Sequence, residues 1–369
     1  MSDTRAIKAL KKLPLVQKID NSLWDTLIPH ISFTKLAQGE TLFEAGRQSK
    51  NLYVVVDGEL GLYMPCGDIG GSYFLQIRNK GETAGDFAVL NGGNHLVSAV
   101  ASKKCNIALF PRFAFEKLTD IDSSILAHVY DVAAELSRRV TIAKAYLKLF
   151  GDITHDTMNA LLQKTTTQHF HSGQVVFEEG DPPDALLVIL SGKLIVETFD
   201  QNGDVRRMAE VRAPGTVGEL ALLADATRSA TVIAARESTV ASLGHEDFYA
   251  LIAPKAEMLM RLSRMVVRRQ MKNVRQEHLA TADRNFVLMP LDSRLPLRRF
   301  VHQLKSAMQG IGSAFTLNSR SFDTLYGRTG ASLTSFDDIF NSAVAEWLDD
   351  KENTFDSLVY VVDLSLIHI

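Results

Sequence analysis

The sequence Gly218-Glu219-Leu220-Ala221-Leu222, followed after a short interval by Arg228-Ser229-Ala230-Thr231, decides how this chain is interpreted. A glycine directly precedes a carboxylate, and an arginine follows nine positions beyond that carboxylate. Apolar residues surround both charges, and an unpaired charge in such surroundings is costly. A small anion that carries a ribose-like diol would satisfy the arginine and the carboxylate together.

Composition limits the class of protein. The chain has 369 residues, of which 46% are hydrophobic and 22% charged, and its formal net charge is −3. This length allows two or three domains, and the charge balance gives no general preference for nucleic acid or anionic membranes. Because only two cysteines occur, Cys66 and Cys105, we expect no disulfide framework and a cytoplasmic location. No apolar run approaches the roughly 20 residues that cross a bilayer, and the polar start is not a secretory signal.

One long passage of the sequence occurs twice. Gly39, Gly46 and Gly58 recur as Gly173, Gly180 and Gly192, each shifted by 134 positions. Gly85, Ala88, Ala101 and Phe115 recur as Gly218, Ala221, Ala234 and Phe248, each shifted by 133. A shift that changes by one residue over so long a span is a single loop deletion, which indicates a tandem duplication. Repeats of this length predict two similar domains rather than a solenoid.

Each repeat combines short strands with terminal helices. Apolar runs such as 52–56 and 60–63 alternate with glycine turns, which predicts barrels of short strands. Residues 123–149 and 254–278 have the apolar spacing of helices. The predicted fold class is α+β, with a helical lead at 1–22, a first domain at 23–149 and a second domain at 150–278.

The pattern changes after about residue 280. We predict a buried strand at 286–291, an amphipathic helix at 296–308, a strand at 314–317, a helix at 335–348 and a strand at 358–363. This alternation predicts a short, Rossmann-like α/β segment with parallel strands over residues 283–363. Residues 364–369 match a translated sequencing-adapter end, so we expect a library scar there and a natural chain that continues beyond Asp363.

The chemistry of the opening stretch points to a phosphate ester of a sugar. Gly218 permits a sharp turn, after which backbone N–H groups can converge on a phosphate. Arg228 offers a planar guanidinium that stays charged and can bind two phosphate oxygens. Glu219 can accept a hydrogen bond from a ribose 2′-hydroxyl, while Ser229 and Ala230 add a hydroxyl and a backbone donor.

The run from Gly218 to Val232 resembles the phosphate-binding segment of cyclic nucleotide-binding domains, and its nine-residue spacing is similar to that of protein kinase A regulatory subunits. The F-x-x-G-D at 177–181 and the turn at 191–192 also fit. The resemblance covers residues 150–275 and implies β-roll (jelly-roll-like) barrels with flanking helices, which bind cyclic AMP or cyclic GMP and no other cofactor. It implies ligand contacts at Gly218, Glu219, Leu220, Ala221, Arg228, Ser229 and Ala230.

Three features depart from that family. Thr227 stands where proline is usual, and Val217 stands where an aromatic residue is common. No aromatic residue occurs between Tyr249 and Phe286 to cap the base. We therefore expect one of three methionines to cover it, Met258, Met260 or Met265. The residues leave the choice between cyclic AMP and cyclic GMP open.

The first repeat keeps the glycines but changes the charged residues. Gly85 is followed by Asp86, a shorter carboxylate, and His95 stands at the position of Arg228. Histidine is largely neutral at pH 7 and lacks the guanidinium fork. We expect a structural or regulatory domain without ligand. The alternative, a weak or different anion site, predicts binding that strengthens below about pH 6.5 as His95 gains a proton.

Arginines recur on the helix that ends the second repeat. They could contact phosphate lipids or a partner, but we expect a solvated face formed by Arg261, Arg264, Arg268, Arg269, Lys272 and Arg275. The opposite, apolar stripe is predicted at Leu259, Leu262, Val266 and Val267. Histidines and cysteines show no metal-ligand spacing and no G-x-S-x-G is present, so we predict neither a metal site nor catalytic residues in this sequence.

Residues 285–363 resemble the segment that precedes the patatin-like catalytic domain in the neuropathy target esterase family. The matching features are V-L-M-P-L-D with a later L-P-L, the A-x-x-x-I-G at 307–312, and Trp347-Leu348 before the strand at 358–363. The resemblance implies a regulatory region of a patatin-like serine esterase or phospholipase. Its partners would be a cyclic nucleotide and its own downstream catalytic domain, without nucleic acid, and membrane contact would come through the parent protein.

Two alternatives stay open. Non-binding tandem barrels could act as a protein-docking scaffold, or the chain could be a kinase regulatory-subunit-like sensor of cyclic AMP. The second alternative would need an N-terminal docking helix pair and an inhibitor arm, and only about 30 residues precede the first expected strand. A transcription factor of the catabolite-activator type would need a helix-turn-helix, where residues 281–363 indicate strands and helices of an α/β layer instead.

Overall fold

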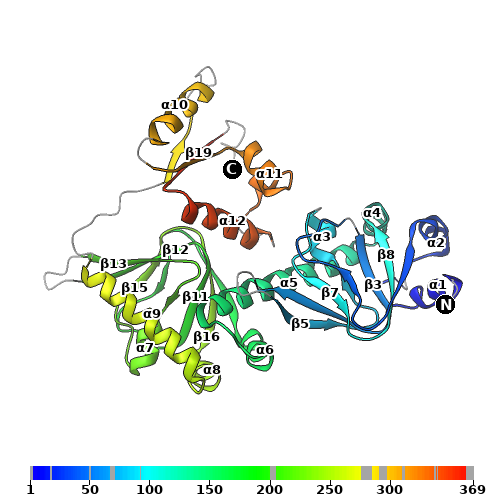
Figure 1. The fold of residues 1–369 in the computed structure, drawn as a ribbon, viewed down its shortest axis with the longest axis horizontal. Helices are drawn as coiled ribbons and strands as arrows, with labels where there is room; N and C mark the ends of the chain where they lie inside the picture. Colours follow the sequence, from blue (N-terminus) through cyan, green and yellow to red (C-terminus); the bar gives the residue numbers. More distant parts are fainter. Residues whose placement is uncertain are drawn as a thin grey trace. The chain divides into compact units, whose positions relative to one another are not determined.

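The fold was analysed in a computed structural model, drawn in Figure 1. It describes residues 3–16, 19–49, 51–66, 71–91, 93–199, 205–275, 285–290, 297–309, 312–335, 338 and 340–362. The chain divides into two compact units, Met1–Lys144 and Ala145–Ile369, which are taken in turn below. The adapter-like residues 364–369 lie outside the described residues.

The first unit holds the first repeat. It opens with α1 (Asp3–Leu10), α2 (Asn21–Leu27) and the 3-10 turn η1 (Ile28–His30). Two antiparallel sheets of four strands follow, in the orders β1-β8-β3-β6 and β2-β7-β4-β5. The strands are β1 (Ser32–Leu36), β2 (Thr41–Phe43), β3 (Asn51–Asp57), β4 (Leu60–Pro65), β5 (Ser72–Arg78), β6 (Thr83–Ala84), β7 (Ser98–Ala101) and β8 (Cys105–Pro111). The later helices are α3 (Asp86–Asn91), α4 (Arg112–Ile121) and α5 (Ser123–Phe150), which continues into the second unit.

The second unit repeats this plan with the same strand orders, β14-β11-β16-β9 and β10-β15-β12-β13. The strands are β9 (Thr166–Phe170), β10 (Val175–Phe177), β11 (Ala185–Ser191), β12 (Lys193–Phe199), β13 (Val205–Arg212), β14 (Thr216–Val217), β15 (Thr231–Ala234) and β16 (Ser238–Gly244). The helices are α6 (His155–Lys164), α7 (Glu219–Ala224), α8 (His245–Leu251) and α9 (Ala256–Arg275). Even the irregularities recur, because the pairing of β3 with β8 shifts between Val55 and Asp57 and that of β11 with β16 shifts between Ile189 and Ser191. The duplication read from the sequence is therefore a duplication of backbone structure.

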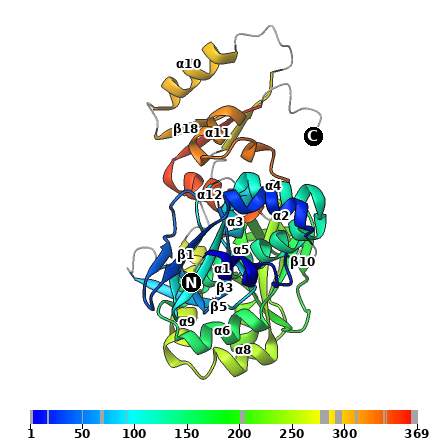
Figure 2. The same cartoon turned by 90° about the vertical axis from the view of Figure 1, so that its right-hand side faces the viewer.

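A small parallel sheet, in the order β17-β19-β18, completes the second unit. Its elements are β17 (Asn285–Leu288), α10 (Leu297–Gln309), β18 (Ala314–Leu317), α11 (Ser319–Tyr326), η3 (Ala331–Leu333), α12 (Asn341–Thr354) and β19 (Ser357–Val361). In Figures 1 and 2 α12 lies between this sheet and the second β-domain, and it contacts both β19 and β11. The parallel strands predicted for this segment are confirmed.

Three details of this segment differ from the prediction, and one of them is the helix α11 at Ser319–Tyr326, where no helix is predicted. The first strand is not buried, since Phe286 is 44% and Val287 62% exposed. An apolar run does not reveal that its strand lies at a sheet edge, as β17 does. The last helix spans Asn341–Thr354 rather than 335–348. Its polar final turns lack apolar periodicity, and they are held by ion pairs from the second β-domain to Asp349 and Glu352.

Candidate functional site

A left-handed glycine turn starts the predicted site. Gly218 has φ of +83°, a conformation that side-chain-bearing residues rarely adopt, and it is the N-cap of α7. A Cβ at this position would overlap Nη1 of Arg228 and would lie 3.2 Å from the carbonyl oxygen of Ala185. Glycine is therefore required at position 218 for two reasons. It tolerates the left-handed backbone angle, and it leaves space for the guanidinium of Arg228.

Arg228 is 2% exposed and is held on several sides. Its Nη1 donates to the carbonyl of Gly218 at 3.0 Å, and its Nη2 donates to that of Ala185 at 2.9 Å and to the carboxylate of Asp184. The guanidinium lies over the ring of Phe177, 4.3 Å from its centroid. Its Nε is buried and has no hydrogen-bond partner among the described residues. One donor of a fixed cation thus remains available.

Glu219, at the first helical position of α7, is equally buried. Its Oε1 accepts a hydrogen bond from Nη1 of Arg269 at 2.9 Å, and the same nitrogen donates to the carbonyl of Thr216 at 2.8 Å. Its Oε2 is buried without a partner among the described residues. Burial raises the pKa of Glu219 above that of an ordinary glutamate, and the Arg269 charge opposes this shift.

One cavity of about 370 Å³ unites the predicted residues. All seven line it: Gly218, Glu219, Leu220, Ala221, Arg228, Ser229 and Ala230. The remaining wall is mostly apolar, from Phe177, Val196, Met208, Ala209, Val217, Val232 and Val266, with Thr198, Arg269 and Gln270 beside them. Pockets of this size and make-up hold small ligands.

The two unsatisfied atoms define what the cavity can hold. Nε of Arg228 is a cationic donor, and Oε2 of Glu219 is an acceptor. Leaving either atom unpaired in an apolar cavity costs free energy, which a ligand with an anionic oxygen and a hydroxyl would recover. No cluster of histidine, cysteine, aspartate or glutamate side chains suited to a metal occurs in the part of the chain that the structure describes.

Sequence reasoning missed Asp184 and gave Arg269 the wrong face. Arg269 was predicted to be solvated, yet it bonds Glu219 inside the site. The signal was available, because Arg269 lies three and seven positions after Val266 and Leu262 and so shares their buried side of α9. The prediction for Val267 is also wrong, since it is 55% exposed.

The cavity residues that α9 contributes differ from the expected ones. Val266, Arg269 and Gln270 of α9 line the cavity, whereas none of the three candidate methionines is among its lining residues. Met258 is 5% exposed and packs in the interior, and Met260 and Met265 line a neighbouring groove.

The equivalent site of the first domain is filled by aromatic rings. His95 stands at the sequence position of Arg228 and stacks on Phe43 with ring centroids 3.7 Å apart. Tyr53 lies where the guanidinium lies in the second domain, since a Cβ at Gly85 would meet its ring at 2.8 Å. Burial lowers the pKa of His95 to about 4. An anion site that strengthens as His95 gains a proton would therefore need a pH near 4 rather than just below 6.5, and this alternative stays a prediction.

Comparison with known proteins agrees with the repeat. A family model described as the cyclic nucleotide-binding domain matches residues 33–122 and 167–255. The chain contains two cyclic nucleotide-binding domains. Among solved structures, the regulatory domain of Toxoplasma gondii PKA with cAMP shares 20% identity and covers 72% of this chain and 96% of that one, with a TM-score of 0.34.

Sequence similarity to curated proteins extends beyond the two cyclic nucleotide-binding domains to nearly the whole chain. The patatin-like phospholipase domain-containing protein 7 of Rattus norvegicus is 23% identical over 97% of this chain and 26% of its own length. The lysophospholipase NTE1 of Candida albicans is 22% identical over 93% of this chain and 25% of its own. The chain thus spans about a quarter of the length of these curated relatives. Within the described residues, no helix is both long and apolar enough to cross a membrane.

Proposed function

We propose that the second domain binds a cyclic nucleotide, cyclic AMP or cyclic GMP, and that the chain is the regulatory region of a patatin-like esterase. The observation that carries the proposal is the pair of buried, unpartnered atoms in one cavity, Nε of Arg228 and Oε2 of Glu219. A cyclic phosphate and a ribose 2′-hydroxyl are joined in one small molecule and would satisfy both.

The proposal gives a role to the residues that would bind the ligand and to those that orient them. Arg228 binds the cyclic phosphate, and Asp184 and Phe177 keep its guanidinium oriented. Glu219 accepts from the 2′-hydroxyl while Arg269 neutralises its charge. The remaining polar contacts come from the Ser229 hydroxyl and from the backbone of Leu220, Ala221 and Ala230. The base lies against Val196, Met208 and Val266.

The regulatory role rests on the relatives. They are named as lysophospholipases and patatin-like phospholipase domain proteins, and they match this chain almost throughout. In the longer protein, nucleotide binding would shift α9, which supplies Arg269 to the site, and so bias the catalytic domain. A ligand achieves this only by its different affinity for the two states of the protein.

Isothermal titration calorimetry of the 369-residue chain tests the binding. Arg228→Ala should weaken cyclic nucleotide binding on the order of a hundredfold, because it removes a buried, charge-assisted contact. Since the substitution also removes structural hydrogen bonds, Glu219→Gln serves as a second variant that keeps the side-chain shape. Arg320→Ala, at an exposed position of α11, is the matched control. Unchanged affinity in folded Arg228→Ala and Glu219→Gln would contradict the proposal.

A second role fits the first domain. Its site is occupied by Phe43, Tyr53 and His95, and it has the same strand orders as the second domain. We propose that this domain is a structural or docking module without nucleotide. The stoichiometry of nucleotide binding to the whole chain tests this role, because a binding-competent first domain would add a second site.

A further inference from the structure

The helix α9 has two different sides. One side is buried, with Met258, Leu262 and Val266 each no more than 6% exposed, and it carries Arg269 into the nucleotide site. The opposite side displays three apolar side chains that are more than half exposed: Met260 at 52%, Val267 at 55% and Met271 at 52%. Their spacing of seven and four residues places them in one row along the helix.

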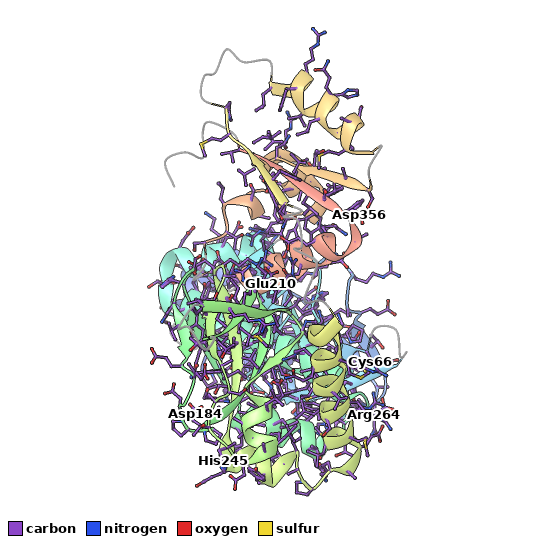
Figure 3. The ribbon with its side chains drawn as sticks, turned by 90° about the vertical axis from the view of Figure 1, so that its left-hand side faces the viewer. Cys66, Asp184, Glu210, His245, Arg264 and Asp356 are labelled. Carbon is purple, nitrogen blue, oxygen red and sulfur yellow. The ribbon has the colours of Figure 1, made fainter. Side chains whose placement is uncertain are left out.

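Arginines flank this exposed row. Arg264 and Arg268 lie on the exposed side, and neither makes an ion pair with any of the residues described. Arg261 pairs with Glu257 at 3.0 Å. Arg264 and Arg268 are therefore two exposed charges without an ion-pair partner among the described residues. Figure 3 labels Arg264 at the outer side of α9, away from Asp184 of the nucleotide site.

A groove continues the same surface onto the β-domain. It has a volume of about 1280 Å³ and lies beside α9. Its charged lining comes from Lys148, Glu210, Glu257, Arg261, Arg264, Arg268 and Arg269. Its apolar lining comes from Leu149, Met208, Ala209, Pro214, Ala256, Met260 and Met265. Methionine side chains adapt readily to irregular apolar partners. The surface therefore combines a row of exposed apolar side chains with a groove in which arginines outnumber the two glutamates and methionines supply part of the wall.

The positive charges of Arg264 and Arg268 favour an anionic partner over a second copy of the chain. A second copy of the chain would bring its own Arg264 and Arg268 against this row, and like charges oppose such pairing. An apolar row flanked by arginines is the pattern of helices that lie in a membrane interface, where cations meet phosphates and apolar side chains enter between head groups. The acidic residue in the sequence of α9 is Glu257, and its pairing with Arg261 reduces its repulsion of an anionic surface.

We propose that the outward face of α9 binds an anionic lipid surface, with Arg264 and Arg268 on the lipid phosphates and Met260, Val267 and Met271 inserted at head-group depth. This contact does not depend on the nucleotide-binding function. It also differs from the sequence-based expectation that any membrane contact comes only through the parent protein.

Vesicle co-sedimentation of the full chain tests the proposal. Vesicles of phosphatidylcholine with phosphatidylserine should bind the chain, vesicles of phosphatidylcholine alone should not, and salt should weaken the binding. Arg264→Ala with Arg268→Ala should weaken it about thirtyfold, since each basic residue near such a surface contributes roughly fivefold. Val267→Gln with Met271→Gln should also weaken it, although the charge is unchanged.

The matched control is Arg299→Ala with Arg320→Ala, which removes two exposed arginines from α10 and α11 and should leave vesicle binding intact. All variants should keep the cyclic nucleotide affinity of the parent chain, so that loss of vesicle binding is separated from damage to the nucleotide site. The proposal is overturned if the charge control weakens binding as much as the α9 variant, or if the glutamine variant binds vesicles normally. Light scattering that shows α9-dependent dimers without vesicle binding would overturn it too.

Discussion

At the scale of single residues, the two domains differ in the partners that surround an equivalent buried carboxylate. Glu219 has Arg269 beside it, whereas Asp86, fully buried at the equivalent position, has no hydrogen bond to either oxygen among the described residues. Burial raises the pKa of Asp86, and the nearby Thr83 hydroxyl and Arg78 charge offset this only in part. Burial thus disfavours the ionised form of Asp86, which lowers the stability of the first domain at neutral pH.

We predict that Asp86→Asn stabilises the first unit at pH 7 by about 1 kcal/mol, because an amide carries no charge to bury. Because the folded pKa of Asp86 is raised, its folded state holds the proton over a range where the unfolded state has lost it. Stability is then fully present below the ordinary aspartate pKa of about 4 and falls as the pH rises through the raised value. Thermal unfolding at several pH values should show a smaller decline in Asp86→Asn than in the parent. An equal decline, or the same effect from the exposed Asp131→Asn, would contradict this.

Gly218 offers a second test at this scale. Gly173 has the same φ of +83°, but a methyl group added there would meet open space, whereas a Cβ at Gly218 would overlap Arg228. Each alanine substitution should cost about 1–2 kcal/mol of stability through its backbone angle. Only Gly218→Ala should also lower cyclic nucleotide affinity, by at least about tenfold, because it displaces the guanidinium. Calorimetry on both variants separates the two effects, and equal affinity losses would refute the explanation.

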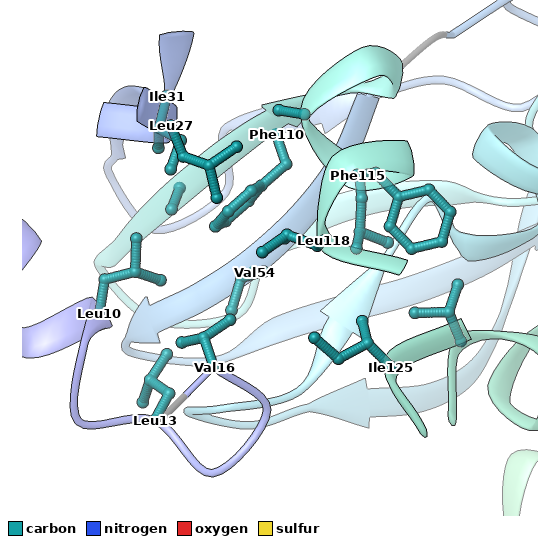
Figure 4. Close-up of a cluster of buried hydrophobic side chains, with 14 of the residues drawn as sticks. Leu10, Leu13, Val16, Leu27, Ile31, Val54, Phe110, Phe115, Leu118 and Ile125 are labelled. Carbon is teal, nitrogen blue, oxygen red and sulfur yellow. The ribbon is translucent and has the colours of Figure 1, made fainter. Parts of the chain in front are cut away.

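At the scale of elements, the N-terminal helical segment depends on tertiary packing for its stability. The N-terminal lead is anchored by Leu10, Leu13 and Val16, which join the core cluster of the first domain near Val54 and Phe110 (Figure 4). This segment is short and would have little stability alone, because isolated helices of this length are marginal in water. Its burial against β3 and β8 makes it part of the domain.

The helix α12 is attached to the second β-domain by charge. Glu352, with a side chain only 4% exposed, accepts from Arg236 at 2.9 Å, from Arg212 at 3.0 Å and from the hydroxyl of Tyr360 at 3.3 Å. Arg236 follows β15 closely, and β15 begins directly after the Arg228–Ala230 segment of the site. The α/β segment is thus attached close to the strand that follows the Arg228–Ala230 wall of the cavity.

We predict that Glu352→Ala destabilises the α/β segment by about 2 kcal/mol, because charged hydrogen bonds of this kind are worth about 1.5–3 kcal/mol. The measurement uses a Trp24→Phe background, because this substitution removes the other tryptophan of the chain. The fluorescence of Trp347 on α12 then reports the unfolding of the α/β segment. Urea unfolding followed by Trp347 fluorescence should shift to lower denaturant. The exposed Asp350→Ala is the control, and an equal shift in both variants would count against the ion cluster.

At the scale of the whole molecule, duplication has left two similar folds with different interiors. Strand order, strand irregularities and glycine turns are shared. The cavity described for the second domain holds a buried arginine, and the equivalent region of the first holds a stack of aromatic rings. One fold therefore surrounds two different interiors, a cavity beside a buried arginine and a stack of aromatic rings.

We predict that the chain binds one cyclic nucleotide, because His95, Phe43 and Tyr53 occupy the first site. Calorimetry should give a stoichiometry of about one. His95→Ala should leave the stoichiometry and affinity unchanged, whereas Arg228→Ala should weaken the affinity about a hundredfold. A second site of similar affinity, or binding that survives in Arg228→Ala and disappears in His95→Ala, would contradict the assignment of roles to the two domains.

The sequence by itself determined the duplication, the glycine turns and the common site of Glu219 and Arg228. These features are local, because left-handed backbone angles demand glycine and strand pattern follows from the order of apolar residues. Only the tertiary structure decided that Tyr53 and His95 pack together in the first domain and that β17 lies at a sheet edge. Each of these depends on which distant segments pack together, and no spacing along the chain specifies that.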